Sequence, residues 1–161
     1  YHLSSEKSHS VMRKSFSRLS GASDDGAGSL KIQGRYLEAL RIGGNAVWFE
    51  FEEICGGPRG QSDYIEITKM FHTVFISNIP KFDFENLDKK RRLTWLVDEF
   101  YDQSVNLVVS AEGTIQELFS NTKRDSETLR TESRLIEMQS DKYIRRKPVF
   151  QYPHSHKMVE I

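Results

Sequence analysis

The sequence predicts an α/β fold, in which a partial sheet with flanking helices follows a small β-meander. The run Val74–Ser77 is apolar and β-branched, and Pro80 ends it, which favours a buried strand. Val105–Ser110 is a second apolar run of strand length. Between them, four apolar residues follow the spacing of an amphipathic helix: Leu93, Leu96, Val97 and Phe100. A strand, a helix and a strand predict one βαβ unit.

The first part of the chain predicts a helix and a linker. Met12, Phe16 and Leu19 are spaced i, i+4, i+7, so we expect an N-terminal helix within residues 1–19. Residues 20–29 are small, polar and rich in glycine, which is typical of a flexible linker. We expect the remaining α/β part to cover residues 30–144.

The meander is predicted from three short apolar runs separated by glycine-containing turn signals. These runs are Leu30–Ile32, Tyr36–Ile42 and Val47–Phe51. Alternation within the third run predicts that Val47, Phe49 and Phe51 share one face of the sheet.

Capping patterns predict the remaining helices. Asp63 with Glu66, and Thr114 with Glu117, have the spacing of a capping box. The last helix is expected over residues 126–143. Residues 145–161 are basic, contain proline and lack periodicity, so a disordered tail is predicted there.

Composition excludes several classes of protein. The 161 residues contain 23 Lys and Arg and 23 Asp and Glu, so net charge gives no support for nucleic-acid binding. No run approaches the roughly 20 apolar residues of a transmembrane helix. A single cysteine, Cys55, excludes an internal disulfide, and the five histidines have no recognisable metal-ligand spacing. We therefore expect no metal site.

Two motifs only partly imitate a nucleotide site. The loop GGPRGQSD, with Arg59, is rich in glycine, but a phosphate-binding loop needs a Gly-Lys pair, and the chain has none. Asp98 and Glu99 in LVDEF imitate the acid pair that holds magnesium, yet they lie off the apolar stripe of a helix. We interpret them as solvated structural or interface residues.

Arg130 and Arg134 lie one turn apart on the last predicted helix. Two interpretations are open. Both guanidinium groups can converge on one phosphate or carboxylate, or Arg134 can belong to a surface ion-pair ladder with Glu137.

The order of these motifs resembles the C-terminal half of the ZapE and Afg-type family of AAA+-like P-loop ATPases. The resemblance is carried by three segments, Trp48–Pro80, Arg91–Glu112 and Arg130–Tyr143, together with YHL at the start and GRYLEAL. Most of residues 1–144 is covered.

The resemblance implies ATP and Mg²⁺ as cofactors of a longer protein, whose Walker motifs lie upstream of Tyr1. The chain alone is therefore expected to bind neither and to be inactive. Arg134 is the first candidate for a second-sensor arginine that contacts the nucleotide, and Arg130 is the second.

The resemblance also implies self-association. It implies FtsZ as partner and recruitment from the cytoplasm to the division site for a bacterial protein, and protein clients for a mitochondrial one. The rival interpretation is a free-standing protein-interaction module without nucleotide chemistry. Its candidate surface residues are Arg59, Arg91, Arg92, Asp98 and Glu99.

Overall fold

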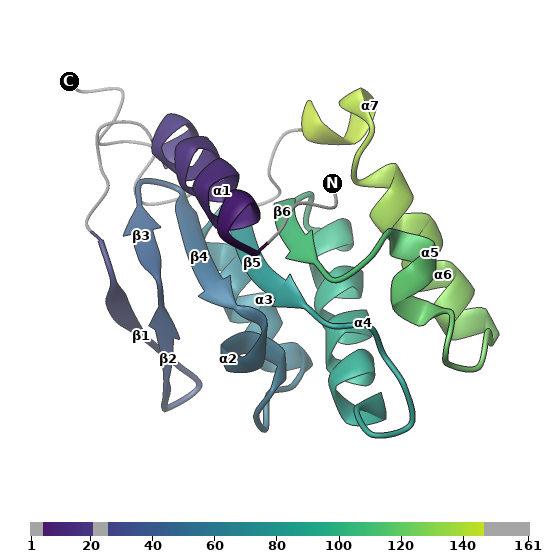
Figure 1. The fold of residues 1–161 in the computed structure, drawn as a ribbon. Helices are drawn as coiled ribbons and strands as arrows, with labels where there is room; N and C mark the ends of the chain where they lie inside the picture. Colours follow the sequence, from purple (N-terminus) through teal and green to yellow (C-terminus); the bar gives the residue numbers. More distant parts are fainter. Residues whose placement is uncertain (1–4, 21–25, 147–161) are drawn as a thin grey trace.

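The computed structural model describes residues 5–20 and 26–146, and it confirms the α/β class. Four strands form the main sheet in the order β3-β4-β5-β6, and β1 and β2 form a separate hairpin (Figure 1). The strands are β1 (Gly28–Ile32), β2 (Arg35–Ala39), β3 (Arg41–Gly43), β4 (Ala46–Glu50), β5 (Thr73–Ile79) and β6 (Asn106–Ala111). The helices are α1 (Ser5–Ser20), α2 (Phe51–Cys55), α3 (Gln61–Met70), α4 (Leu87–Asp102), α5 (Ile115–Phe119), α6 (Ser126–Glu137) and α7 (Asp141–Ile144).

The predicted βαβ unit is present as β5, α4 and β6, with β5 and β6 parallel. β4 is parallel to β5, and the short β3 is antiparallel to β4. Helix α1 covers one face of the sheet, and α3 and α4 cover the other (Figure 1). Among the described residues, no helix combines the length and the apolar composition needed to cross a bilayer.

Strand β5 lies at the centre of the fold. It pairs with β4 on one side and β6 on the other, and every residue of it except Asn78 is buried. Its side chains alternate between two clusters: Phe75 points to the α1 side, while Val74 and Ile76 belong to the main core. Cover on both faces is what its continuous apolar sequence predicts.

The predicted meander differs from the observed strands in two places. The run Tyr36–Ile42 is divided between β2 and β3, which belong to different sheets because β2 pairs with β1 and β3 pairs with β4. Phe51 does not continue β4; it begins α2, and its ring packs 6.0 Å from that of Phe82. Phe51 is thus buried in the same core as Val47 and Phe49, but it enters that core from helix α2 and not from the strand.

The segment between α1 and β1 is shorter than the predicted linker at both ends. Ser20 belongs to α1, while Gly28 and Ser29 belong to β1, where they pair with Ala39 and Glu38. Residues 21–25, which form its centre, lie outside the described residues. Most of the predicted disordered tail, residues 147–161, also lies outside them.

Two helix boundaries need correction, and one is confirmed. Helix α3 begins after Gly60, and the Asp63 carboxylate accepts a hydrogen bond from the Gly60 N–H at 2.7 Å, so Asp63 is the third helical residue and not the cap. The predicted last helix is divided into α6 and α7, because the Ser140 side chain caps α7 by accepting from the Tyr143 N–H. Thr114 caps α5 as predicted.

Candidate functional site on helices α4 and α6

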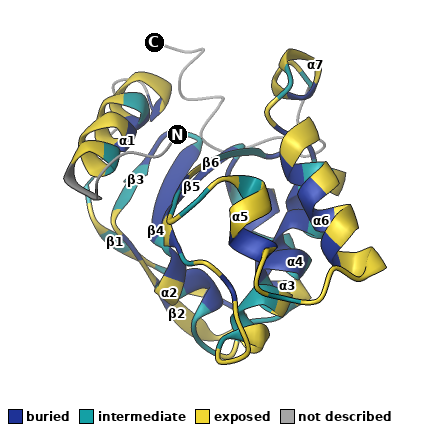
Figure 2. Cartoon of the chain, turned by 45° about the vertical axis from the view of Figure 1, so that its right-hand side comes forward, coloured by how far each residue is buried: buried dark blue, intermediate teal, exposed yellow. Residues whose placement is uncertain are grey.

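Helices α4 and α6 pack side by side at one flank of the sheet (Figures 1 and 2). The apolar stripe of α4 is buried, and α6 contributes Leu135 to the same core. A buried hydrogen bond joins the hydroxyls of Thr94 on α4 and Thr131 on α6 at 3.3 Å. This contact fixes the relative position of the two helices, and it places charged residues of each beside the other.

The two predicted arginines converge on one carboxylate, that of Asp98 on α4. Arg134 Nη1 lies 2.5 Å from Asp98 Oδ1, and Arg130 Nη2 lies 3.1 Å from Oδ2. The hydrogen bond to Asp98 raises the pKa of Arg130. The Asp98 side chain is only 19% exposed, so the carboxylate faces the arginines more than it faces solvent. Asp98 is therefore not a solvated acid; it joins α4 to α6.

Glu137 has other partners, so the predicted ladder between Arg134 and Glu137 is wrong. Its carboxylate accepts from the Tyr101 hydroxyl at 2.7 Å and lies 3.3 Å from Arg146 Nη2. The hydrogen bond to Glu137 raises the pKa of Tyr101.

Aromatic contacts complete the cluster. The guanidinium carbon of Arg134 lies 4.8 Å from the centre of the Tyr101 ring, a cation–π distance. Arg146 lies 5.6 Å from the same ring, and Tyr101 stacks on Tyr143 with ring centres 5.8 Å apart.

Sequence reasoning missed these aromatic and basic partners. Tyr101 lies one turn after Asp98 on α4, which is a spacing that the sequence does display. Arg146 falls within the predicted tail, where no periodic signal marks it.

Glu99 does not take part in the arginine cluster. Burial, and then the nearby Asp102 and Asp98 carboxylates, raise its pKa. The two acids of LVDEF therefore have different surroundings on the same helix.

The other predicted arginines brace the fold. Arg92 Nη1 donates to the Cys55 carbonyl at 3.1 Å and lies 3.2 Å from Asp88. Arg59 donates to the Tyr36 carbonyl at 3.2 Å, and so holds the GGPRGQSD loop against the β1–β2 hairpin.

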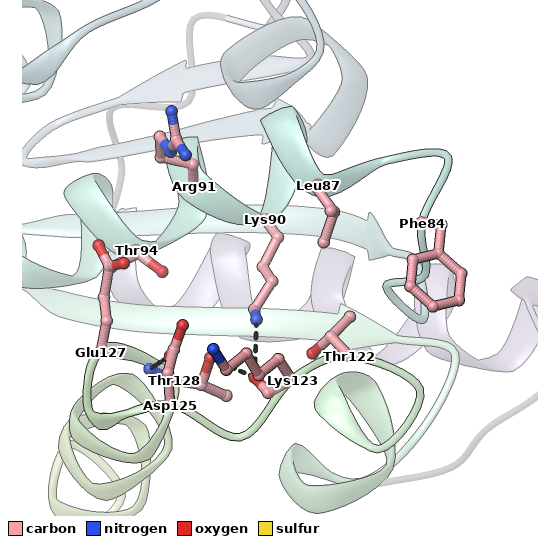
Figure 3. A pocket seen from close by; sticks show the side chains of 10 residues that line it. All are labelled: Phe84, Leu87, Lys90, Arg91, Thr94, Thr122, Lys123, Asp125, Glu127 and Thr128. Carbon is pink, nitrogen blue, oxygen red and sulfur yellow. Dashed lines mark hydrogen bonds between the residues drawn. The ribbon is translucent and has the colours of Figure 1, made fainter.

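Arg91 contributes to a pocket of about 250 Å³ between the first half of α4 and the loop before α6. Lys90 and Lys123 lie near each other in it, while the Arg91 guanidinium points away from the other lining residues (Figure 3). Phe84 and Leu87 lie at the opposite end from Glu127 (Figure 3).

The pocket and the arginine cluster lie toward opposite ends of the parallel strands. The chain enters α4 from the carboxyl end of β5 and leaves it toward the amino end of β6. The pocket residues on the first half of α4 are thus near the carboxyl ends of the strands, where open α/β sheets bind ligands. Asp98, in the second half of α4, is nearer the amino ends of the strands.

The GGPRGQSD loop does not fit the phosphates of ATP. In the GGPRGQSD loop the Gly60 N–H already donates to Asp63, and the buried Asp63 carboxylate is paired with Arg35 at 2.7 Å. Asp63 thus occupies the loop N–H and the Arg35 guanidinium, two groups that could otherwise bind an anion. Within residues 5–20 and 26–146, no group of three or more His, Cys, Asp or Glu residues is arranged to hold a metal ion.

Comparison with known proteins identifies relatives over most of the chain. Escherichia coli (strain K12) cell division protein ZapE is 33% identical over 141 residues, which cover 88% of this chain and 38% of ZapE. Lactation elevated protein 1 homolog B of Danio rerio is 36% identical over 109 residues, which cover 68% of this chain and 22% of that protein.

A third relative, the uncharacterized protein C115.02c of Schizosaccharomyces pombe, is 32% identical over 90 residues, or 56% of this chain and 20% of that protein. The chain spans less than two fifths of the length of each of these relatives. No solved structure matches it. The family model described as AFG1-like ATPase matches residues 1–147. The chain therefore belongs to the AFG1-like ATPase family.

Proposed function

We propose that this chain forms the C-terminal α/β part of an ATP-hydrolysing protein, and that ATP and Mg²⁺ are cofactors of that longer protein. Family membership over residues 1–147 supports the proposal. The sequence contains no Gly-Lys pair, so residues outside this chain would supply the phosphate-binding loop. On its own, the chain would be inactive.

Within this proposal, Arg134 is the residue that contributes to nucleotide chemistry, and Arg130 is the second candidate. The observation that carries this assignment is that two arginines share one carboxylate. The group of Arg130, Arg134 and Asp98 therefore has a net positive charge. Only Nη1 of Arg134 bonds to Asp98, and among the described residues its other nitrogens have no hydrogen-bond partner. A guanidinium has five N–H donors, so a phosphate oxygen can be bound without breaking the contact to Asp98.

The location of the cluster restricts how a nucleotide reaches it. Asp98 lies toward the amino ends of the strands, away from the usual ligand-binding end of such a sheet. A phosphate bound by Arg134 would therefore be held by residues of the longer protein or of a neighbouring copy. Self-association of the longer protein is part of the proposal. Because one relative is a cell division protein, a bacterial member is proposed to act in the cytoplasm at the division site with FtsZ. A mitochondrial member is proposed to act on protein clients.

The test is the ATP turnover of the longer protein with Arg134→Ala. We expect at least a tenfold loss of kcat, about 1.4 kcal/mol, with little change in Tm. Arg134→Lys should not restore turnover, because an ammonium cannot reproduce the guanidinium fork. Lys69→Ala is the control, since Lys69 pairs with a single exposed carboxylate, Glu66, at 3.0 Å and lies outside the arginine cluster. If Arg130→Ala alone reduces turnover, the role belongs to Arg130; if neither does, the arginines are structural.

The second candidate function is a protein-interaction module without nucleotide chemistry. It is favoured by the exposed Phe84 and Leu87, which lie together at the α4 pocket, since neighbouring exposed apolar side chains and aromatic residues are typical of binding surfaces. ATP turnover by the longer protein separates the two functions, because the module predicts none.

A further inference from the structure

The α4 pocket has an apolar rim that the fold leaves in water. Phe84 is 88% exposed and Leu87 is 46% exposed. The pocket volume of about 250 Å³ exceeds the roughly 150 Å³ cavity that accommodates a benzene ring in a protein interior. A second aromatic side chain therefore has room to enter beside this rim.

The loop that carries Phe84 is held in a fixed shape. The Asp83 N–H donates to the Asn86 side chain at 2.7 Å, and the Glu85 N–H donates to the Asp83 carboxylate at 2.8 Å. Phe82 is fully buried, and its N–H donates to the Leu118 carbonyl at 2.8 Å. Because these contacts order the loop in advance, binding through Phe84 costs little conformational entropy.

The charges around the pocket are complementary to those of the loop. Lys90 and Lys123 form no ion pair among the described residues, and the Lys90 ammonium only donates to the Lys123 carbonyl at 3.5 Å (Figure 3). Phe84 itself is flanked by the exposed acids Asp83 and Glu85. One molecule thus carries both an acid-aromatic-acid loop and a basic pocket that accepts such a loop.

The two carboxylates that line the pocket, Asp125 and Glu127, offset part of this attraction, but three basic side chains line it as well: Lys90, Arg91 and Lys123. Asp125 accepts from the Thr128 N–H at 2.8 Å as the cap of α6, and this hydrogen bond, together with the nearby charges of Lys90 and Lys123, lowers the pKa of Asp125. Glu127 lies at the end of the pocket away from Phe84 (Figure 3).

We propose that two copies of this chain associate through these surfaces, with Phe84 of each copy inserted into the α4 pocket of the other. Asp83 and Glu85 of each copy then meet Lys90 and Lys123 of its partner. Such an arrangement is isologous, so both halves of the contact form together and the dimer closes. This proposal does not depend on ATP hydrolysis, because none of these residues belongs to the arginine cluster.

The dimer is expected to be weak and sensitive to salt. One loop and one pocket per copy bury less surface than the 1,200–2,000 Å² of a stable complex, by the usual range for interfaces. Exposed charges contribute to the attraction, and salt screens them. We therefore expect association in the micromolar range or weaker at low ionic strength, decreasing as salt is added.

The first test is sedimentation velocity of the 161-residue chain over a concentration series at low salt. We expect Phe84→Ser to raise the dimer dissociation constant at least tenfold. Ile136→Ser is the matched control, because Ile136 is 47% exposed on α6 but does not line the pocket. Phe84 is too exposed for its loss to unfold the chain, and circular dichroism checks this.

The second test exchanges the charges. The pocket variant carries Lys90→Glu and Lys123→Glu, and the loop variant carries Asp83→Asn and Glu85→Lys. The change Asp83→Asn retains a side-chain oxygen that can accept from the N–H of residue 85, so the loop keeps its shape. Each variant alone has loop and pocket of like charge, so neither should dimerise. Mixed together, each loop meets a pocket of opposite charge, and a heterodimer should form.

Three results would overturn the proposal. The first is a chain that stays monomeric at every concentration, which would leave the pocket to a different partner. The second is a dimer that Phe84→Ser and the control affect equally. The third is a mixture of the two charge variants that remains monomeric while both variants stay folded.

Discussion

Arg134 and Asp98 are 36 residues apart in the chain, yet their Nη1 and Oδ1 atoms lie 2.5 Å apart across the contact between α6 and α4. Arg130 adds a second guanidinium to the same carboxylate. Two donors on consecutive turns of α6 are therefore fixed to one point on α4, which makes this cluster the main polar connection between the two helices.

The first prediction concerns the energy of this connection. A double-mutant cycle with Asp98→Ala and Arg134→Ala, measured by urea unfolding, should give a coupling of about 0.5–1 kcal/mol, because the pair is only partly exposed. The exposed pair Lys69 and Glu66 is the control and should give about 0.2–0.5 kcal/mol. Equal coupling in both cycles would show that the Asp98 contact contributes no more than an exposed ion pair.

The second prediction concerns ATP. Calorimetry of the 161-residue chain with ATP and Mg²⁺ should show no saturable binding tighter than about 10 μM, or roughly 7 kcal/mol. The physical reason is that no glycine-rich loop followed by a lysine is present to hold the phosphates. Tight binding would reveal a nucleotide site of a different kind.

The third prediction concerns Cys55. Burial raises the pKa of its thiol to about 12, although a hydrogen bond from the Tyr64 hydroxyl opposes the shift. The native protein at about pH 8 should therefore react with iodoacetamide far more slowly than the protein unfolded in guanidinium, since the thiolate is the nucleophile. Mass spectrometry of timed samples measures both rates. Similar rates would mean that the core opens readily around α2.

The fourth prediction concerns the pH dependence of stability. Burial lowers the pKa of His72 from 6.5, so below pH 6.5 the unfolded chain takes up a proton on this residue that the folded chain does not. The contribution of His72 therefore lowers the free energy of unfolding as the pH falls below 6.5. In urea titrations at a series of pH values, the free energy of unfolding of His72→Gln should decrease less over this range than that of the wild type. Parallel curves for the two proteins would contradict this assignment.

Much of the fold could be predicted because local patterns and tertiary packing agree. The stripe of Leu93, Leu96, Val97 and Phe100 is buried on α4, and the continuous apolar run of β5 is covered on both faces. Errors occur where a long-range contact overrides the local pattern. Phe51 continues the alternation of β4, yet it turns into α2 and packs against Phe82.

The candidate site shows the same limit. The sequence places Arg130 and Arg134 on one helix face, and this is confirmed by their shared carboxylate. It could not choose between partners, because Glu137 is near in sequence whereas Asp98 is near only in the folded chain. Nor could it identify the α4 pocket, which combines residues of one helix with a loop some 30 positions later.

Helix α1 has a hydrophobic cluster of its own, so it can open separately from the rest of the molecule. Met12 and Phe16 pack on Ala46, Trp48 and Phe75, apart from the main core on the other face. The cluster is small, so α1 can leave the sheet in a local opening that costs less free energy than global unfolding. Its amide protons should exchange with deuterium sooner than those of β5, and Trp48 fluorescence should change before the sheet is lost.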